Sequence, residues 1–213
     1  MSRLSRNHRF SALGLLVAEI IFIIGSTWWP ETGPAPFWAF VMYALLFGVG
    51  GYHLSQSRRW LAVYLPCSAI ALVANFFGTS LGGIILREIS ITAVHIILFW
   101  AVFYHSFIRE KIPKADRILA GIAGYLLLGL LWTSQFALFG SLGIDGLMNS
   151  ISGEPATRHE TLYFSFITLT AVGYGEIVPV VPAARTLTIF TSLSGILYLA
   201  ILISTLVSGS KNR

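Results

Sequence analysis

Long apolar stretches constrain this chain more than any other feature of its sequence. A helix needs about 20 consecutive, mostly apolar residues to cross the hydrocarbon core of a bilayer. Six stretches of the 213 residues have this character, and we predict a transmembrane helix in each: 10–29, 37–53, 60–77, 81–107, 118–139 and 185–207. Only 11% of the residues are charged, whereas a soluble domain would carry about 25%. The sequence therefore predicts an all-α membrane protein embedded in a lipid bilayer.

The basic residues indicate how the spans are oriented. With six spans, eleven of the fourteen Lys and Arg residues fall on one side of the membrane: Arg3, Arg6, Arg9, Arg58, Arg59, Arg109, Lys111, Lys114, Arg117, Lys211 and Arg213. Cytoplasmic loops carry an excess of basic residues, so we expect both termini in the cytoplasm and the protein in the cell membrane (plasma or inner membrane). The formal net charge of +5 then reflects topology, and we expect no nucleic-acid partner. The first apolar stretch is too long for the apolar region of a signal peptide and is expected to remain as a span.

The segment between the fifth and sixth spans has a different character. Residues 160–170 are half-apolar and too short to cross a bilayer, so we expect a re-entrant or interfacial helix there. Thr157 and Glu160, which follow Pro155, form a capping-box pattern that is typical of a helix start. Residues 168–176 read TLTAVGYGE and lead from this helix toward the sixth span. Irregular backbone at membrane depth is tolerated only where it lines a water-filled path or is buried in protein.

Two glycines in this loop, Gly173 and Gly175, permit left-handed backbone conformations at little cost. An extended strand whose successive carbonyls all point to one side needs such conformations. Its row of oxygens can replace the hydration shell of a monovalent cation. The loop is therefore a candidate selectivity filter.

TLTAVGYGE resembles the signature of potassium channels, commonly written T-x-T-T-V-G-Y-G-D. The six-span layout with a pore loop before the last span resembles the tetrameric pore-loop cation channels. The specific match covers about residues 163–195, whereas the first four spans match only in number. The resemblance implies a homotetramer that conducts K⁺ passively, without catalytic activity and without a cofactor. It also implies a four-helix scaffold over residues 1–110 and a pore domain over residues 111–213, made of outer helix, pore helix, filter and inner helix.

The resemblance also implies roles for individual residues. Backbone carbonyls along the filter are expected to bind K⁺, the last of them closing the outer end: Ala171, Val172, Gly173, Tyr174 and Gly175. Four further residues are expected to support the filter: Thr168, Thr170, Tyr163 and Glu176. Tyr163 would donate a hydrogen bond to Glu176, and Thr170 would hydrogen-bond behind the filter. Gly195 is the expected hinge of the inner helix.

Ala171 departs from the potassium-channel signature, because relatives usually have a threonine there whose hydroxyl completes the innermost ion site. Glu176 replaces the usual Asp but keeps the carboxylate. Two alternatives therefore stay open. A looser filter would give a poorly selective monovalent cation channel, and an incidental GYG loop would leave a membrane transporter or enzyme. The sequence displays neither the catalytic pairs of an intramembrane protease nor the inverted repeats of a transporter.

The fourth predicted span carries few charges for a voltage sensor. Positions 87, 90, 93, 96 and 99 read Arg, Ser, Ala, Ile and Phe, and one charge supplies about 2.3 kcal/mol per 100 mV. We therefore expect a scaffold and not a sensor. Arg87 needs a partner within the membrane, and Glu19 lies at a matching depth in the first span, so we predict a buried Glu19–Arg87 ion pair, with Glu88 as the rival partner. The sequence leaves open what opens the pore and whether a regulatory subunit binds.

Overall fold

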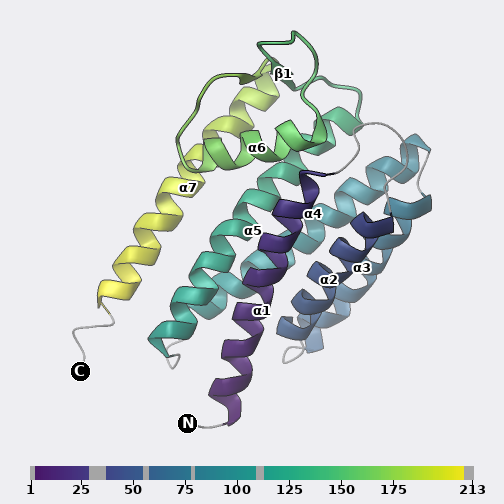
Figure 1. The fold of residues 1–213 in the computed structure, drawn as a ribbon. Coiled ribbons are helices and arrows are strands. Elements are labelled where there is room, and N and C mark those ends of the chain that lie inside the picture. Colours follow the sequence, from purple (N-terminus) through teal and green to yellow (C-terminus); the bar gives the residue numbers. More distant parts are fainter. Residues whose placement is uncertain (1–2, 29–36, 55–57, 78–79, 109–112, 209–213) are drawn as a thin grey trace.

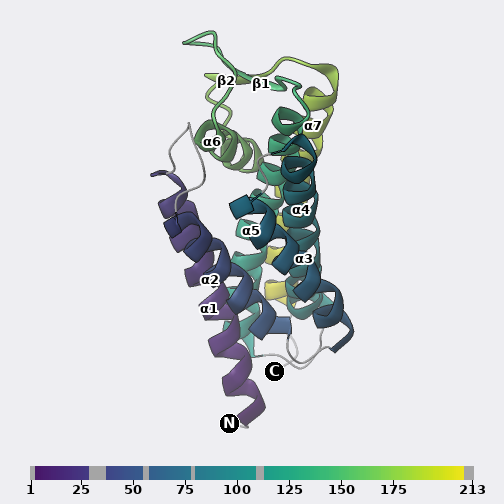
Figure 2. The ribbon, with the colours of Figure 1, turned by 90° about the vertical axis from the view of Figure 1, so that its right-hand side faces the viewer.

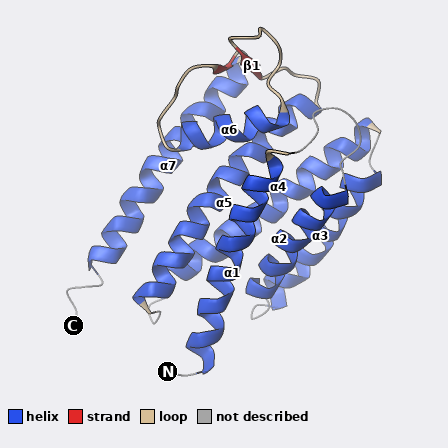
Figure 3. Ribbon diagram, in the orientation of Figure 1, coloured by secondary structure: helices blue, strands red, loops and turns tan. Residues whose placement is uncertain are grey.

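The computed structural model describes residues 3–28, 37–54, 58–77, 80–108 and 113–208, and these are mostly helical (Figure 3). The helices follow in the order α1 (Arg3–Ser26), α2 (Phe37–Leu54), α3 (Arg58–Phe77), α4 (Leu81–Phe103), α5 (Lys114–Ser141), α6 (Arg158–Leu169) and α7 (Pro182–Ser208). A π-helical turn, η1 (Tyr104–Ile108), extends α4. Two short strands, β1 (Leu147–Asn149) and β2 (Ile177–Pro179), lie before and after α6 and pair antiparallel.

The long helices lie side by side, and the short helix α6 crosses them near one end of the bundle (Figure 1). Figure 2, turned by 90°, shows α6 nearly along its axis. Helix α1 begins and α7 ends at the opposite end of the bundle. Helix α5 is central, because it packs against α1, α4, α6 and α7. The loop that follows α6 therefore lies in the half of the molecule remote from where α1 begins and α7 ends.

The lengths of the helices bear on the number of spans. Among the described residues, four helical segments are long and apolar enough to cross a membrane: Phe37–Leu54, Leu81–Ile108, Lys114–Ser141 and Pro182–Val207. They coincide with the second, fourth, fifth and sixth predicted spans. The first and third predicted spans contain shorter apolar helical segments, Ala12–Ser26 and Arg59–Asn75. The predicted all-helical membrane architecture therefore holds for four spans, and a count of six stays a prediction.

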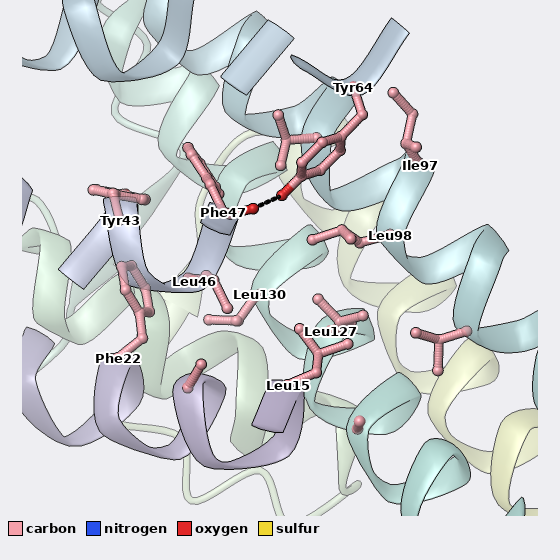
Figure 4. Packing of buried hydrophobic residues seen from close by; sticks show 14 of the residues in the cluster. Leu15, Phe22, Tyr43, Leu46, Phe47, Tyr64, Ile97, Leu98, Leu127 and Leu130 are labelled. Atoms are coloured by element: carbon pink, nitrogen blue, oxygen red, sulfur yellow. Dashed lines mark hydrogen bonds between the residues drawn. The ribbon is translucent and has the colours of Figure 1, made fainter. Parts of the chain in front are cut away.

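Large apolar side chains from α1 to α4 pack against α5 in the core of the bundle (Figure 4). Tyr64 of α3 is fully buried there, and its hydroxyl donates a hydrogen bond of 2.8 Å to the carbonyl oxygen of Phe47 in α2. Gly50 provides the space for this phenol, because a Cβ at that position would lie 2.6 Å from the Tyr64 oxygen. The bond links α2 to α3 across the core.

The structure contradicts the predicted Glu19–Arg87 ion pair. Arg87 instead binds its neighbour Glu88, with Nη2 at 2.6 Å and Nε at 3.0 Å from Oε1. The carboxylate oxygens of Glu19 are buried without a hydrogen-bond partner among the described residues. The prediction matched depths along two helices, but α1 packs mainly against α2 and α5. The flexible Arg87 side chain reaches the adjacent residue although the two Cβ atoms point to different faces.

We predict that Tyr64→Phe lowers the free energy of unfolding by about 0.5–1.5 kcal/mol, with a value near 0.6 kcal/mol typical between membrane helices. The phenyl ring keeps the packing and loses only the hydrogen bond to Phe47. The measurement is reversible unfolding in mixed micelles, followed by circular dichroism.

Tyr52→Phe is the matched control, because Tyr52 is 56% exposed on α2. Equal unfolding free energies for the two variants would contradict a stabilising role for the buried bond.

Candidate functional site

Helix α6 starts with the capping box that the sequence predicts. The Thr157 hydroxyl accepts from the backbone N–H of Glu160 at 3.2 Å, and the Glu160 carboxylate accepts from the backbone N–H of Thr157 at 2.8 Å. The amide group of Asn149 donates to the same carboxylate at 2.6 Å. The Thr157 N–H above all, and then Asn149, hold the pKa of Glu160 below its usual value. The start of α6 is thus tied to the end of β1.

The body of α6 is held against α5 by aromatic packing. Phe164 is buried and meets Phe136 of α5 edge to face, with ring centroids 5.2 Å apart. Gly129 of α5 faces the tip of the Phe166 ring, so that a Cβ there would collide with it. These contacts fix where α6 ends and therefore where the next segment begins.

Helix α6 ends in a Schellman motif. The N–H of Val172 donates to the carbonyl of Ile167 at 2.8 Å, and the N–H of Ala171 donates to the carbonyl of Thr168 at 3.0 Å. Ala171 has a φ of +58°, the left-handed conformation that this motif requires and that usually selects glycine. The non-glycine residue at this position therefore stores backbone strain at the first residue of the candidate filter.

Residues 171–175 are all exposed in the single chain, including half of Val172 and 73% of Tyr174. Gly173 and Gly175 have φ values of +55° and +93°, so both glycines adopt left-handed conformations as expected. Among the described residues, no hydrogen bond ends on the four consecutive carbonyl oxygens of residues 171–174. The carbonyl of Thr170 also accepts no hydrogen bond among the described residues, whereas those of Leu169 and Gly175 are engaged.

On the side of this row toward α6, the carbonyl of Leu169 accepts from the Tyr125 hydroxyl of α5 at 3.2 Å. On the side toward β2, the carbonyl of Gly175 accepts from the Ser150 hydroxyl at 3.2 Å, and that of Glu176 accepts from the same hydroxyl at 3.0 Å. The segment thus has engaged carbonyls at both ends and free oxygens between them. Oxygens of this kind are suited to a cation and to no acid–base or nucleophilic chemistry.

The outer end of the segment carries the hydrogen bond predicted between Tyr163 and Glu176. The Tyr163 hydroxyl donates to the Glu176 carboxylate. This bond, more than burial, raises the pKa of Tyr163 to about 12. The second turn of α6 is thereby joined to the residue that follows the candidate filter.

The base of the segment rests on α7. Gly195 of α7 is buried against Leu169, and a Cβ there would overlap the Leu169 carbonyl oxygen. Trp132 of α5 donates to the Ser194 hydroxyl at 2.9 Å. Helix α7 is continuous from Pro182 to Ser208. The geometry gives Gly195 a packing role, and its predicted hinge role stays a prediction.

The two threonines that were predicted to support the filter lie in different surroundings. Thr168 is buried in the last turn of α6. Thr170 was expected to hydrogen-bond behind the filter, but its hydroxyl donates back to the carbonyls of Phe166 and Ile167, at 2.8 and 3.3 Å. It therefore closes its own helix, because a hydroxyl four residues after a helical carbonyl finds that acceptor first.

Sequence reasoning missed Asn149, Ser150 and Tyr125. The first two lie in a Gly-rich loop where Asn–Ser reads as a turn, and Tyr125 lies in an apolar span with no local signal for its partner. Across the part of the chain that the structure describes, no three His, Cys, Asp or Glu side chains are grouped to hold a metal ion.

Comparison with known proteins agrees with this geometry. Residues 84–209 match the sequence model of a family described as "Ion channel". A 76-residue stretch, 35% of the chain, is 37% identical to a protein of Oryza sativa subsp. japonica named "Two pore potassium channel b". The matched stretch covers 22% of that relative, so it corresponds to only a small part of the larger protein. No solved structure gives a significant match.

We predict that Gly195→Ala destabilises the protein by about 1–3 kcal/mol, the usual cost of overpacking. The added methyl group must displace the backbone at Leu169, which no side-chain rotation can avoid. The measurement is the thermal unfolding midpoint and the yield of folded protein.

Gly82→Ala is the control, because nothing lies within 4 Å of a Cβ at this position in α4. There the substitution should be neutral or stabilising by up to about 1 kcal/mol. A Gly195→Ala protein as stable as this control, with altered opening, would instead favour the hinge.

A second prediction follows from the Tyr163–Glu176 hydrogen bond. The folded state raises the pKa of Tyr163 to about 12, from an ordinary value of about 10. Its stabilising effect is therefore full below about pH 10 and is lost as the pH rises toward 12. The melting temperature of wild type should exceed that of Tyr163→Phe by a margin that is constant up to about pH 9 and shrinks above pH 10.

Melting curves of both proteins from pH 7 to 11.5 measure this margin. Tyr52→Phe, on the exposed face of α2, corrects for general effects of alkali. A margin that does not change with pH would show that the phenol proton is not what stabilises the fold.

Proposed function

Because this chain belongs to the ion-channel family whose model matches residues 84–209, we propose that it is a potassium-selective channel that conducts K⁺ passively through a tetrameric filter. The chain is thus a membrane protein of a channel family and not an enzyme. Its likeness to a named potassium channel supports K⁺ as the permeant ion.

The observation that carries the proposal is the run of carbonyl oxygens at residues 170–174 that accept no hydrogen bond among the described residues, bounded by engaged carbonyls at Leu169 and Gly175. Buried backbone carbonyls that no donor satisfies are rare in folded proteins, and the proposed tetramer would bury this segment among its subunits. Here five occur in succession, from Thr170 to Tyr174, on a segment that is exposed in the single chain. Potassium ions would supply the missing partners, because carbonyl oxygens replace a K⁺ hydration shell. We assign ion binding to the carbonyls of Ala171, Val172, Gly173 and Tyr174, whereas the engaged Gly175 carbonyl only closes the outer end.

One strand cannot surround an ion, so the proposed site needs copies of the chain around an axis. A ring of four such strands suits K⁺, and closed rotational symmetry is the rule for homo-oligomers. The exposure of the Val172 and Tyr174 side chains in the single chain supports burial by neighbouring subunits. Exposed apolar residues of α7 would face these neighbours or lipid: Ile189, Phe190, Leu193, Ile196 and Leu197.

We further propose six spans, with α6 as the re-entrant pore helix and with both termini cytoplasmic in the cell membrane. Helix α1 begins and α7 ends at the same end of the bundle (Figure 1), which supports an even number of crossings. Residues 1–110 would be the scaffold and residues 111–213 the pore domain. The ion pair between Arg87 and Glu88 neutralises the arginine and supports a scaffold that does not sense voltage. The proposal is compatible with the channel acting alone or with a regulatory subunit.

A poorly selective monovalent cation channel is the second candidate, and Ala171 is the observation that favours it. Ala171 holds a strained positive φ and offers no hydroxyl to the innermost ion site. Against this, the outer end of the segment is braced by Tyr163 and Ser150. These braces favour a filter of fixed bore and therefore the K⁺-selective candidate.

The test is K⁺ flux against Na⁺ flux through the purified protein in liposomes, with the number of subunits measured in detergent. We predict a tetramer with K⁺ flux at least about tenfold faster than Na⁺ flux, a difference that corresponds to about 1.4 kcal/mol. Equal fluxes would favour the poorly selective channel, and no flux from a tetramer would contradict the channel proposal.

A matched pair of glycine variants checks that the flux passes through the filter. Gly173→Ala places a side chain at a φ of +55° in the filter, whereas Gly143→Ala does so at +70° in the turn after α5, where nothing lies within 4 Å of the added Cβ. Gly173→Ala should abolish selective flux and Gly143→Ala should preserve it.

A further inference from the structure

Asn149 and Ser150, in the loop before α6, contact both ends of the unit formed by the pore helix and the filter. The pairing of β1 with β2 places them there, since Asn149 lies opposite Ile177 in the ladder. Glu176 immediately precedes Ile177. The loop before the pore helix is thus brought alongside the exit of the filter.

Ser150 makes three hydrogen bonds to this exit. Its backbone N–H donates to the Glu176 carbonyl at 2.7 Å. Its hydroxyl is shared between the carbonyls of Gly175 and Glu176, at 3.2 and 3.0 Å. The Gly175 oxygen therefore faces Ser150, whereas the carbonyls of residues 171–174 have no such donor among the described residues.

Asn149 holds Ser150 in this position. Its side-chain oxygen accepts from the backbone N–H groups of Ile151 and Ser152, at 2.9 and 3.2 Å, which fixes the turn. Its side-chain nitrogen donates to Glu160 at the start of α6. Together with the bond from Tyr163 to Glu176, this closes a ring of hydrogen bonds around the outer end of the filter.

We propose that Ser150 is a positioning residue that sets where the row of ion-facing carbonyls ends. This inference rests on the proposed function and names a residue that controls selectivity at the same site. Gly175 has no side chain and a φ of +93°, so the peptide units on either side of it rotate easily unless something holds them. The Ser150 hydroxyl holds the Gly175 carbonyl and so limits the rotations at Gly175 that would otherwise let the adjoining Tyr174 carbonyl, the outermost of the free oxygens, swing away. Without the hydroxyl the outermost ring of oxygens loses its fixed bore, and Na⁺ is excluded less well.

The test compares Ser150→Thr with Ser150→Val, which have the same shape and differ in the hydroxyl. Ser150 is exposed, so both side chains fit without repacking. Reversal potentials in mixed K⁺ and Na⁺ should give a K⁺/Na⁺ permeability ratio about threefold to tenfold lower for Ser150→Val, the range that one net hydrogen bond supports. Ser150→Thr should stay close to wild type. Ser152→Ala is the control, because that hydroxyl accepts from the backbone N–H of Glu154 in the same turn and makes no hydrogen bond to the filter among the described residues.

Hydrogen–deuterium exchange of the segment 173–178 gives a second readout that does not depend on conduction. The segment should exchange about threefold to tenfold faster in Ser150→Val than in Ser150→Thr. If the two variants agree in exchange and in permeability ratio, the positioning role is overturned even though the channel is K⁺-selective. If wild type conducts no K⁺ but the exchange rates differ as stated, the proposed function fails while Ser150 still positions this segment.

Discussion

Five consecutive carbonyl oxygens without hydrogen-bond donors among the described residues, from Thr170 to Tyr174, are the constraint around which α5, α6, α7 and the loops beside them are arranged. Backbone acceptors are normally satisfied by secondary structure, side chains or water, and membrane depth removes the last of these. A chain can keep such a row only if the flanking backbone is firmly held and if something else meets the oxygens. The proposed K⁺ meets them, and the surrounding contacts hold the flanks.

Each flank is held by an element that the fold brings from elsewhere in the chain. The carbonyl of Leu169 accepts a hydrogen bond from Tyr125 of α5, and Gly195 of α7 packs closely against it. At the other end, the carbonyl of Gly175 accepts a hydrogen bond from Ser150, which lies 25 residues earlier in the chain. Helix α6 fixes the distance between these anchors, because its start is capped at Thr157 and tied to Asn149. In the proposed channel, the scaffold helices α1 to α4 contribute through α5, against which α1, α4 and α6 all pack.

The local parts of this arrangement could be read from the sequence and the long-range parts could not. The capping box at Thr157 and the left-handed glycines follow from short patterns whose physical cause lies within a few residues. The Tyr163–Glu176 bond followed from the resemblance. The Glu19–Arg87 pair was wrong because depth along two helices says nothing about which helices pack together or how they are rotated. Ser150 was missed because its contact depends on the pairing of two three-residue strands, which are too short to leave a pattern of alternation. The sequence singled out Gly195 as a hinge, which stays a prediction, and only the fold reveals that Leu169 fills the space in front of it.

The most direct test of the central claim is to locate a heavy analogue of K⁺ in the assembled protein. Crystals grown with Tl⁺ or Rb⁺ in place of K⁺ would show by anomalous scattering where the ions lie. The account predicts a tetramer with peaks in single file on its axis, each coordinated by carbonyl oxygens of Ala171, Val172, Gly173 or Tyr174, and no peak coordinated by Gly175 or Glu176 alone. An assembly in which these four carbonyls face away from the axis, or in which the ions lie elsewhere, would contradict it.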